Sequence, residues 1–203
     1  WCTQELLSLA SAHSRPFGED VHTLRVAMGR RLGQQHPCPD ATVVVGLPGP
    51  GEEVAVGVAA ELCLPLERAL TPVGAGPLGA LHDGLDYGSR QRLRVLDAAV
   101  RGRRVVLVTS ALGGGDVVRQ AIARLQGAGA LGVDLRCAAP PVRLACPYGI
   151  AMPGTETLAS SRHPDTDDLA SWLGASSVAW LLGQELEEVL GDRKGRCEAC
   201  LSG

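Results

Sequence analysis

The sequence predicts an α/β fold built around a parallel sheet. Short apolar runs rich in β-branched residues, at 42–45, 104–108 and 132–138, alternate with segments whose apolar residues recur at helical spacing. Each strand of a parallel sheet returns through a crossover, so this alternation is typical of a sheet with helices on both faces. The chain has 203 residues, 45 % of them hydrophobic, which is enough for a single domain over 1–203 with its own core.

The other segments are assigned by the same criteria. Residues 71–84 are rich in Gly, Ala, Pro and Leu and are expected to form a long irregular connection. Residues 177–180 are expected to form a last short strand. Helices are expected at 20–35, 52–64, 90–100, 116–127, 167–173 and 184–190. We divide the chain into an N-terminal segment, 1–19, an α/β core, 20–150, and a C-terminal cap, 151–203.

Composition and charge exclude several classes of protein. The net charge is −3 and the cations are nearly all Arg, so no clustered basic face predicts nucleic-acid binding. No apolar run approaches the roughly 20 residues that a membrane helix needs. Seven cysteines in a chain of this size indicate thiols in a reducing intracellular compartment, the cytoplasm first and the mitochondrion second. Because the chain begins at Trp1 and not at Met, we expect it to be a piece of a longer polypeptide.

A glycine run follows the predicted strand at 104–108. Thr109 and Ser110 end the strand segment, and three consecutive glycines, Gly113, Gly114 and Gly115, precede Asp116, where a helix is expected to begin. Such a turn can hold a phosphate through free backbone N–H groups at the start of the helix. Taken alone the signal is weak, because glycine turns precede helices in every α/β fold.

A Cys-x-x-Cys pair, Cys197 and Cys200, lies near the C-terminus, and Cys2 and Cys146 stand singly. Taken alone, such a pair is compatible with zinc, an iron–sulfur cluster, a redox pair or no function, and zinc outranks iron. Of the other cysteines, Cys137 in a predicted strand and Cys63 near a predicted helix end are expected to be small buried hydrophobic residues.

Several segments together resemble the phosphoribosyltransferase half of glutamine PRPP amidotransferase. Residues 102–108 resemble the entry to the family's PRPP motif, and 137–150, which contain Cys-Pro-Tyr-Gly-Ile, resemble the strand and cysteine loop that follow it. Arg25 with Met28 and Gly29 resembles the helix before the first strand. The resemblance runs over essentially the whole chain. It implies a type I phosphoribosyltransferase-like fold with a small C-terminal cap of helices and cysteines, and the family's glutaminase domain is absent from this chain.

The resemblance also implies a cofactor. A subset of these enzymes carries a [4Fe–4S] cluster, and Cys2, Cys146, Cys197 and Cys200 fall on the positions of its four ligands. We therefore expect a cluster at these cysteines, with zinc as the alternative.

The same resemblance shows which residues this chain lacks. The family holds the ribose hydroxyls of PRPP with two adjacent acidic residues, and Thr109 and Ser110 stand at those positions. Neutral hydroxyls cannot replace charge-assisted acceptors, whose hydrogen bonds are worth roughly 1.5–3 kcal/mol each. Asp116 is expected to cap the next helix, where its carboxylate would occupy the N–H groups that a phosphate needs and repel the phosphate.

The segments that would contact pyrophosphate are altered as well. Gly46, Gly49 and Gly51 keep the backbone shape of the family's turn, but the acidic and hydroxyl side chains expected there are missing. The family's mobile catalytic loop is rich in Lys and Arg, whereas residues 69–89 contain neither. We therefore expect the transferase site to be degenerate.

The sequence leaves three functional hypotheses. The first is a pseudoenzyme: a catalytically degenerate, cluster-bearing protein that serves as a structural or regulatory subunit of a larger assembly. The alternative is an active amidophosphoribosyltransferase domain of purine biosynthesis, which makes phosphoribosylamine from PRPP and ammonia or glutamine. A further alternative is a module that binds a nucleotide or phosphate ligand in the old cleft. The expected partners are other protein chains, in a homo- or hetero-oligomer.

Overall fold

A four-stranded parallel sheet forms the centre of the computed structural model, which describes residues 1–73, 92–191 and 195–202. The strands run in the order β1-β4-β5-β6, and every neighbouring pair is parallel. Their bounds are β1 (Val43–Gly46), β4 (Arg104–Thr109), β5 (Gly132–Cys137) and β6 (Ser177–Trp180). The α/β class and the parallel sheet predicted from the sequence are confirmed. One strand of this sheet, β6, lies within the segment predicted as the C-terminal cap.

Both faces of the sheet are covered. Successive side chains of a strand point to opposite faces, and the four consecutive residues 105–108 of β4 are all fully buried. A strand buried on both sides needs an unbroken apolar run, which is what the sequence Val-Val-Leu-Val provides. The same holds for the three valines of β1.

Helices surround the sheet. The second helix packs on β1 and β4, the fourth packs on β5, and the sixth packs on β6. The α-helices are α1 (Val21–Gln35), α2 (Pro50–Leu62), α3 (Asp97–Val100), α4 (Asp116–Gly127), α5 (Ala159–Arg162), α6 (Thr166–Leu173), α7 (Gly183–Leu190) and α8 (Ala199–Ser202). The other helical turns are η1 (Glu5–Leu9), η2 (Pro16–Gly18) and η4 (Thr155–Thr157). No helix in the described ranges is long and apolar enough to cross a membrane.

Helices α1 and α2 approach each other unusually closely because each has a glycine at the contact. A Cβ added to Gly29 would lie 2.0 Å from the carbonyl oxygen of Val54, and one added to Gly57 would lie 2.0 Å from that of Val26. Neither position can carry a side chain without separating the helices. The pair forms a rigid support beside the start of the chain.

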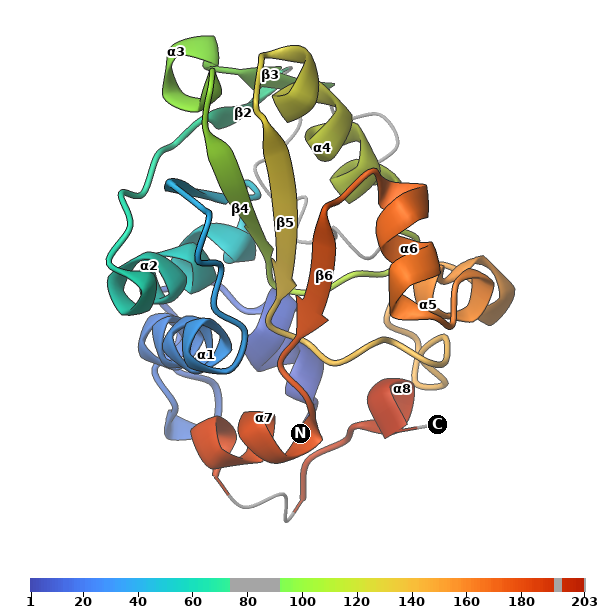
Figure 1. Ribbon diagram of the computed structural model, residues 1–203. Coiled ribbons are helices and arrows are strands. Elements are labelled where there is room, and N and C mark those ends of the chain that lie inside the picture. The colour runs from blue at the N-terminus through green and yellow to red at the C-terminus, as the bar shows by residue number, and fades with distance from the viewer. Residues whose placement is uncertain (74–91, 192–194, 203) are drawn as a thin grey trace.

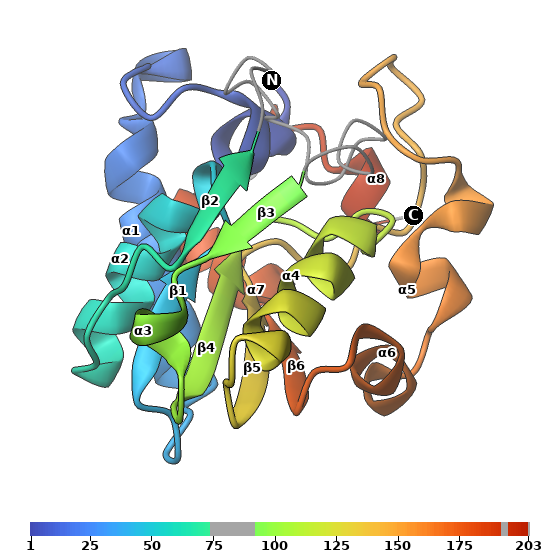
Figure 2. The ribbon, with the colours of Figure 1, turned by 90° about the horizontal axis from the view of Figure 1, so that it is seen from above.

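The predicted helix over 90–100 is only partly correct. Residues Arg92–Val95 form β3, which pairs antiparallel with β2 (Leu70–Val73), and only Asp97–Val100 is helical. The Arg-Leu-Arg-Val alternation, with Leu93 buried, is the period of a strand, which a helical interpretation overlooked. Figure 2 shows β2 and β3 as a separate pair near α4. Residues 71–73 of the predicted irregular connection at 71–84 belong to β2, which corrects that prediction, because they pair with β3. The rest of that connection, and most of the 69–89 segment without Lys or Arg, lies outside the described residues.

The two ends of the chain meet at the carboxyl end of the sheet. In Figure 1 the arrowheads of β5 and β6 point toward the N-terminus and α8. The N-terminal amine of Trp1 donates to the carbonyl of Gly195 at 2.9 Å, and two further backbone hydrogen bonds join residues 1 and 3 to Cys197. The first residues and the last residues therefore form one structural unit.

Candidate functional site

Four cysteines line one pocket at the junction of the chain ends. The pocket has a volume of about 500 Å³. Its walls are otherwise mostly apolar and include Trp1, Leu9, Tyr148 and Ile150. The cysteines are Cys2, Cys146, Cys197 and Cys200, the same four that the sequence comparison with the PRPP amidotransferases singled out.

Backbone contacts place these cysteines. Cys2 and Cys197 lie side by side in a parallel bridge, with hydrogen bonds of 2.6 and 3.1 Å on either side. Cys200 lies in α8, and its carbonyl accepts the N–H of Arg143 at 2.8 Å, which ties α8 to the loop after β5. That loop carries Cys146. Sequence positions nearly 200 residues apart are thus brought to one place by main-chain bonds.

The thiols interact electrostatically. Burial raises the pKa of the Cys2 thiol, and negative charge on Cys197 and Cys146 raises it further, while backbone N–H groups of Gln4 and Glu5 oppose the rise. Burial likewise raises the pKa of Cys200, again with contributions from Cys2 and Cys146. Thiols with raised pKa values stay protonated at neutral pH until a metal displaces the protons.

The four thiols fit the donor set of an iron–sulfur cluster. All seven cysteines are free thiols, so none of the four is consumed by a disulfide. Among the described residues, no group of three or more His, Cys, Asp or Glu side chains is arranged to hold a metal ion. One zinc would draw its sulfurs to about 3.8 Å from one another, because Zn–S bonds are about 2.3 Å long. A [4Fe–4S] cluster takes four thiolates as well, each bound to a different iron.

The turn between β4 and α4 is buried and neutral. Thr109 is fully buried and Ser110 is 2 % exposed. Both hydroxyls have partners within the protein. Thr109 Oγ1 donates to the carbonyl of Ala111 at 3.1 Å, and Ser110 Oγ shares a hydrogen bond of 3.2 Å with Ser8 Oγ. Thr109 and Ser110, which stand where the PRPP amidotransferases are expected to have two acidic residues, therefore carry hydroxyls that are already hydrogen-bonded.

The glycines of this turn are required by its geometry. Gly115 has φ +85°, and a Cβ there would lie 2.8 Å from the ring of Trp172. It is also the N-cap of α4, whereas Asp116 is the first residue of the helix and no side chain caps it. The prediction that Asp116 caps the helix is therefore wrong, because the left-handed Gly115 occupies that position. The carbonyl of Gly113 accepts the N–H of Ala159 at 2.8 Å, while Gly114 faces Pro153.

The turn between β1 and α2 is built by close packing. A Cβ on Gly46 would lie 2.8 Å from the Cα of Glu52, and one on Gly51 would lie 2.8 Å from the carbonyl oxygen of Val108. Gly49 has φ +104° and is the N-cap of α2, and its N–H donates to Glu52 at 3.4 Å. The backbone of this turn thus has the shape expected from its glycines. Glu52 is an acidic group at this turn, but it also pairs with Arg68 at 3.2 Å.

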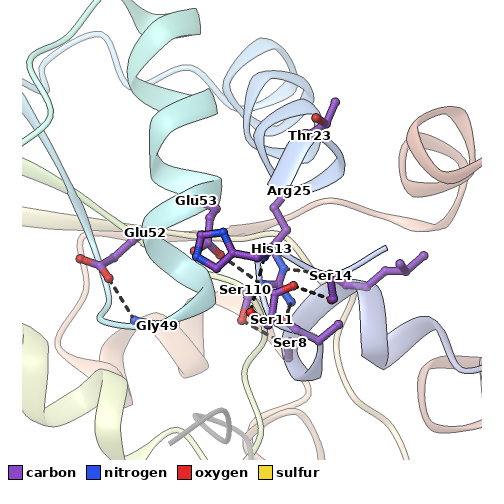
Figure 3. Close-up of polar contacts among 12 residues, drawn as sticks. Ser8, Ser11, His13, Ser14, Thr23, Arg25, Gly49, Glu52, Glu53 and Ser110 are labelled. Atoms are coloured by element: carbon purple, nitrogen blue, oxygen red, sulfur yellow. Dashed lines mark hydrogen bonds and ion pairs between the residues drawn. The ribbon is translucent and has the colours of Figure 1, made fainter. Parts of the chain in front are cut away.

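An N-terminal arm, residues 1–10, packs across this end of the sheet, and sequence reasoning did not predict its role. Arg25, which is 1 % exposed, donates to the carbonyls of Leu6 and Ala10 at 2.9 and 2.8 Å and to Glu53 at 3.0 Å. Figure 3 shows the contact between Arg25 and Glu53 together with the Ser8–Ser110 pair. The arm therefore contacts both candidate regions, because Cys2 lies in the pocket and Ser8 reaches the turn after β4. The only sequence signal for this role of the arm was Arg25, an arginine within a segment predicted to be an amphipathic helix.

Two of the remaining cysteines were assigned from their expected positions. Cys137 is fully buried, as predicted, and burial raises its pKa to about 12. Cys63 is exposed, which contradicts the prediction. It follows α2 as its C-cap, with φ +54°, and such a position projects from the surface.

The parallel sheet and the glycine turn after β4 define an α/β domain of the phosphoribosyltransferase type. The particular proteins to which the chain is similar are the PRPP amidotransferases. Glutamine PRPP amidotransferase from B. subtilis, solved in complex with ADP and GMP, superposes with a TM-score of 0.86 at 29 % identity. That match covers 100 % of this chain and 46 % of the solved chain.

Curated relatives agree. The chloroplastic amidophosphoribosyltransferase of Glycine max is 31 % identical over 206 residues, which are 100 % of this chain and 36 % of the relative. The amidophosphoribosyltransferase of Mycobacterium tuberculosis is 30 % identical over 210 residues, 100 % of this chain and 40 % of the relative. The chain thus spans about two fifths of the length of these relatives. No family model matches it. The resemblance inferred from the sequence is confirmed over the whole chain.

Proposed function

We propose that the chain is the phosphoribosyltransferase-type domain of an amidophosphoribosyltransferase of purine biosynthesis, which forms phosphoribosylamine from PRPP and ammonia. The observation that carries this proposal is the full-length similarity, in sequence and in fold, to proteins named for that activity. The names of these similar proteins favour an active enzyme over the pseudoenzyme hypothesis. The relatives are longer, so ammonia from glutamine would come from a part of the protein outside this chain.

The turn after β4 determines how such a domain would bind PRPP. Backbone N–H groups at the start of α4 would hold the 5′-phosphate, as helix N-termini do. The hydroxyls of Thr109 and Ser110 would have to leave Ala111 and Ser8 to reach the ribose. Two neutral hydrogen bonds would then replace two charge-assisted ones. We therefore expect the affinity for PRPP to be orders of magnitude below that of a turn with two acidic residues.

The test is to incubate the protein with PRPP, magnesium and ammonia and to measure phosphoribosylamine. We expect slow turnover with a high KM for PRPP. The double variant Thr109→Asp/Ser110→Asp should lower that KM by at least about tenfold, because it restores charged acceptors. Thr109→Asn/Ser110→Asn, of the same size but neutral, is the matched control. Absence of product from the wild type and from the acidic variant would contradict the proposal.

A second candidate function rests on the turn itself. Thr109 and Ser110 are buried, neutral and hydrogen-bonded within the protein, which suits a site that no longer binds a sugar phosphate. The chain would then be a structural or regulatory subunit, assembled with copies of itself or with other chains. No heat of binding for PRPP with magnesium, together with no turnover, would favour this candidate.

We also propose that Cys2, Cys146, Cys197 and Cys200 hold a [4Fe–4S] cluster. The support is their convergence on one pocket from three separate segments. When bound, such a cluster would link both ends of the chain to the core and add its binding free energy to folding. Free thiols and an oxygen-sensitive cofactor fit a reducing compartment. Protein purified without oxygen should be brown, and a colourless product would contradict the cluster.

A further inference from the structure

Gln4 is a buried polar residue that touches the cysteine pocket at two points. Its side chain reaches across the junction of the chain ends, where Nε2 donates to Cys200 Sγ at 3.8 Å. Its backbone N–H, like that of Glu5, acts on the Cys2 thiol and opposes the rise in the pKa of that thiol. One residue thus donates to the sulfur of Cys200 and acts through its backbone N–H on the thiol of Cys2.

Burial makes this arrangement unusual. Gln4 is 5 % exposed, and Thr3 beside it is fully buried. A buried primary amide is costly unless its donors have partners, and a neutral thiol is a weak acceptor. A metal-bound thiolate is a much stronger one, so the same contact gains free energy when the cysteines are deprotonated and ligated. An apolar side chain would fill this place more cheaply if no charged sulfur were bound there.

We propose that Gln4 is a positioning residue of the cysteine site, which directs N–H groups at the sulfurs of Cys2 and Cys200 and thereby raises the reduction potential of the bound cluster. This inference rests on the proposed cluster. It concerns only the residue's effect on that cluster and does not depend on whether the domain turns over PRPP.

The direction of the effect follows from charge. Reduction adds one electron to the cluster, and the added negative charge is shared with its sulfur ligands. An N–H donor stabilises the more negative state more than the less negative one, and hydrogen bonds to sulfur are among the features that set cluster potentials. Removing the amide should therefore make the cluster harder to reduce.

Gln4→Met is the informative variant, because methionine has similar length and lacks the N–H donors. In cluster-loaded, oxygen-free protein, we expect the ratio of reduced to oxidised cluster at a fixed potential to fall about tenfold, a shift of about 59 mV to more negative values for one electron. The measurement is a redox titration followed by electron paramagnetic resonance. Gln126→Met is the matched control, since Gln126 donates to the carbonyl of Gly174 away from the pocket.

A second measurement needs no variant. Protein labelled with nitrogen-15 in glutamine side chains should show hyperfine coupling between an amide nitrogen and the reduced cluster. Absence of that coupling, an unchanged potential in iron-loaded Gln4→Met, or an equal shift in Gln126→Met would overturn the role of Gln4. A wild-type protein that binds no iron would overturn the cluster proposal and the role of Gln4 with it.

Discussion

The cysteine pocket and the turn after β4 lie at the same end of the sheet and share the N-terminal arm, yet they differ in chemistry. In the pocket, four side chains that can become charged converge from distant segments and interact with one another. In the turn, two neutral side chains are satisfied by local or neighbouring groups. The thiols of the pocket can therefore still bind a metal, whereas the hydroxyls of the turn already have hydrogen-bond partners.

This difference indicates how much each region gains from binding a metal or a ligand. Four thiols in one pocket gain bonding when a metal replaces their protons. A buried turn whose hydroxyls are already bonded must give up those contacts before it can hold a ligand. We accordingly expect substitutions that remove a thiol of the pocket to change metal binding, and substitutions that remove a contact of the turn to change mainly stability.

The largest effect is expected from removing one thiol of the pocket. Cys2→Ser takes away a ligand at the end of the arm, so iron content should fall from about four per chain to nearly none. Cys63→Ser is the control, because Cys63 is exposed and lies outside the pocket. Iron analysis of protein prepared without oxygen is the measurement. Full iron content in Cys2→Ser would break the comparison, since the pocket would not need all four thiols.

The next effect concerns the arm that joins the two regions. Arg25→Met removes the donor that binds the carbonyls of Leu6 and Ala10 and leaves Glu53 without its buried partner. We expect the free energy of unfolding to fall by about 3 kcal/mol, as for other broken buried pairs. Arg68→Met should change it by less than about 0.5 kcal/mol, because the Arg68 pair is exposed.

Urea unfolding of both variants measures this difference. If the arm holds both regions in place, Arg25→Met should also weaken iron retention, since Cys2 lies on the arm. Equal stability of the Arg25 and Arg68 variants would show that the arm is not anchored in the way described.

A smaller effect is expected from the turn. Gly115→Ala places a methyl group at φ +85° and 2.8 Å from the ring of Trp172, which should cost about 1–3 kcal/mol. Gly127→Ala is the control, because a Cβ there meets no atom within 4 Å. Thermal unfolding compares the two. Iron content should stay normal in both variants, and loss of iron in Gly115→Ala would mean that the regions are coupled more tightly than their contacts indicate.

The smallest effect is expected from Ser8→Ala, which removes the hydrogen bond between the arm and Ser110. The free energy of unfolding should fall by about 1 kcal/mol, the usual worth of one neutral hydrogen bond. Ser14→Ala, which removes an exposed bond to the carbonyl of Ser11, should cost less. A rise in PRPP affinity of Ser8→Ala would sharpen the comparison, because the freed Ser110 could then bind the sugar.

The sequence predicted the parts of this structure that depend on local patterns. Apolar runs such as 104–108 identified the central strands, and helical periodicity identified α1 and α4 almost to the residue. The strand β3 was missed because Arg and Leu alternate over only four residues. The N-cap of α4 was assigned to Asp116 because a glycine in the left-handed conformation cannot be distinguished from other glycines by sequence.

The sites were less accessible to local patterns. The Cys-x-x-Cys pair alone did not identify its partners, and the resemblance to PRPP amidotransferases supplied Cys2 and Cys146. Gln4 meets Cys200 and Ser8 meets Ser110 across 196 and 102 residues, so no spacing in the sequence could reveal those contacts. Only the fold brings these pairs together.

The most direct test of the account is the ratio of metals in protein purified without oxygen. If the four cysteines act as one site, each chain should contain about four irons and as many acid-labile sulfides. One zinc per chain with no sulfide would contradict the cluster and leave a pocket that holds a single ion.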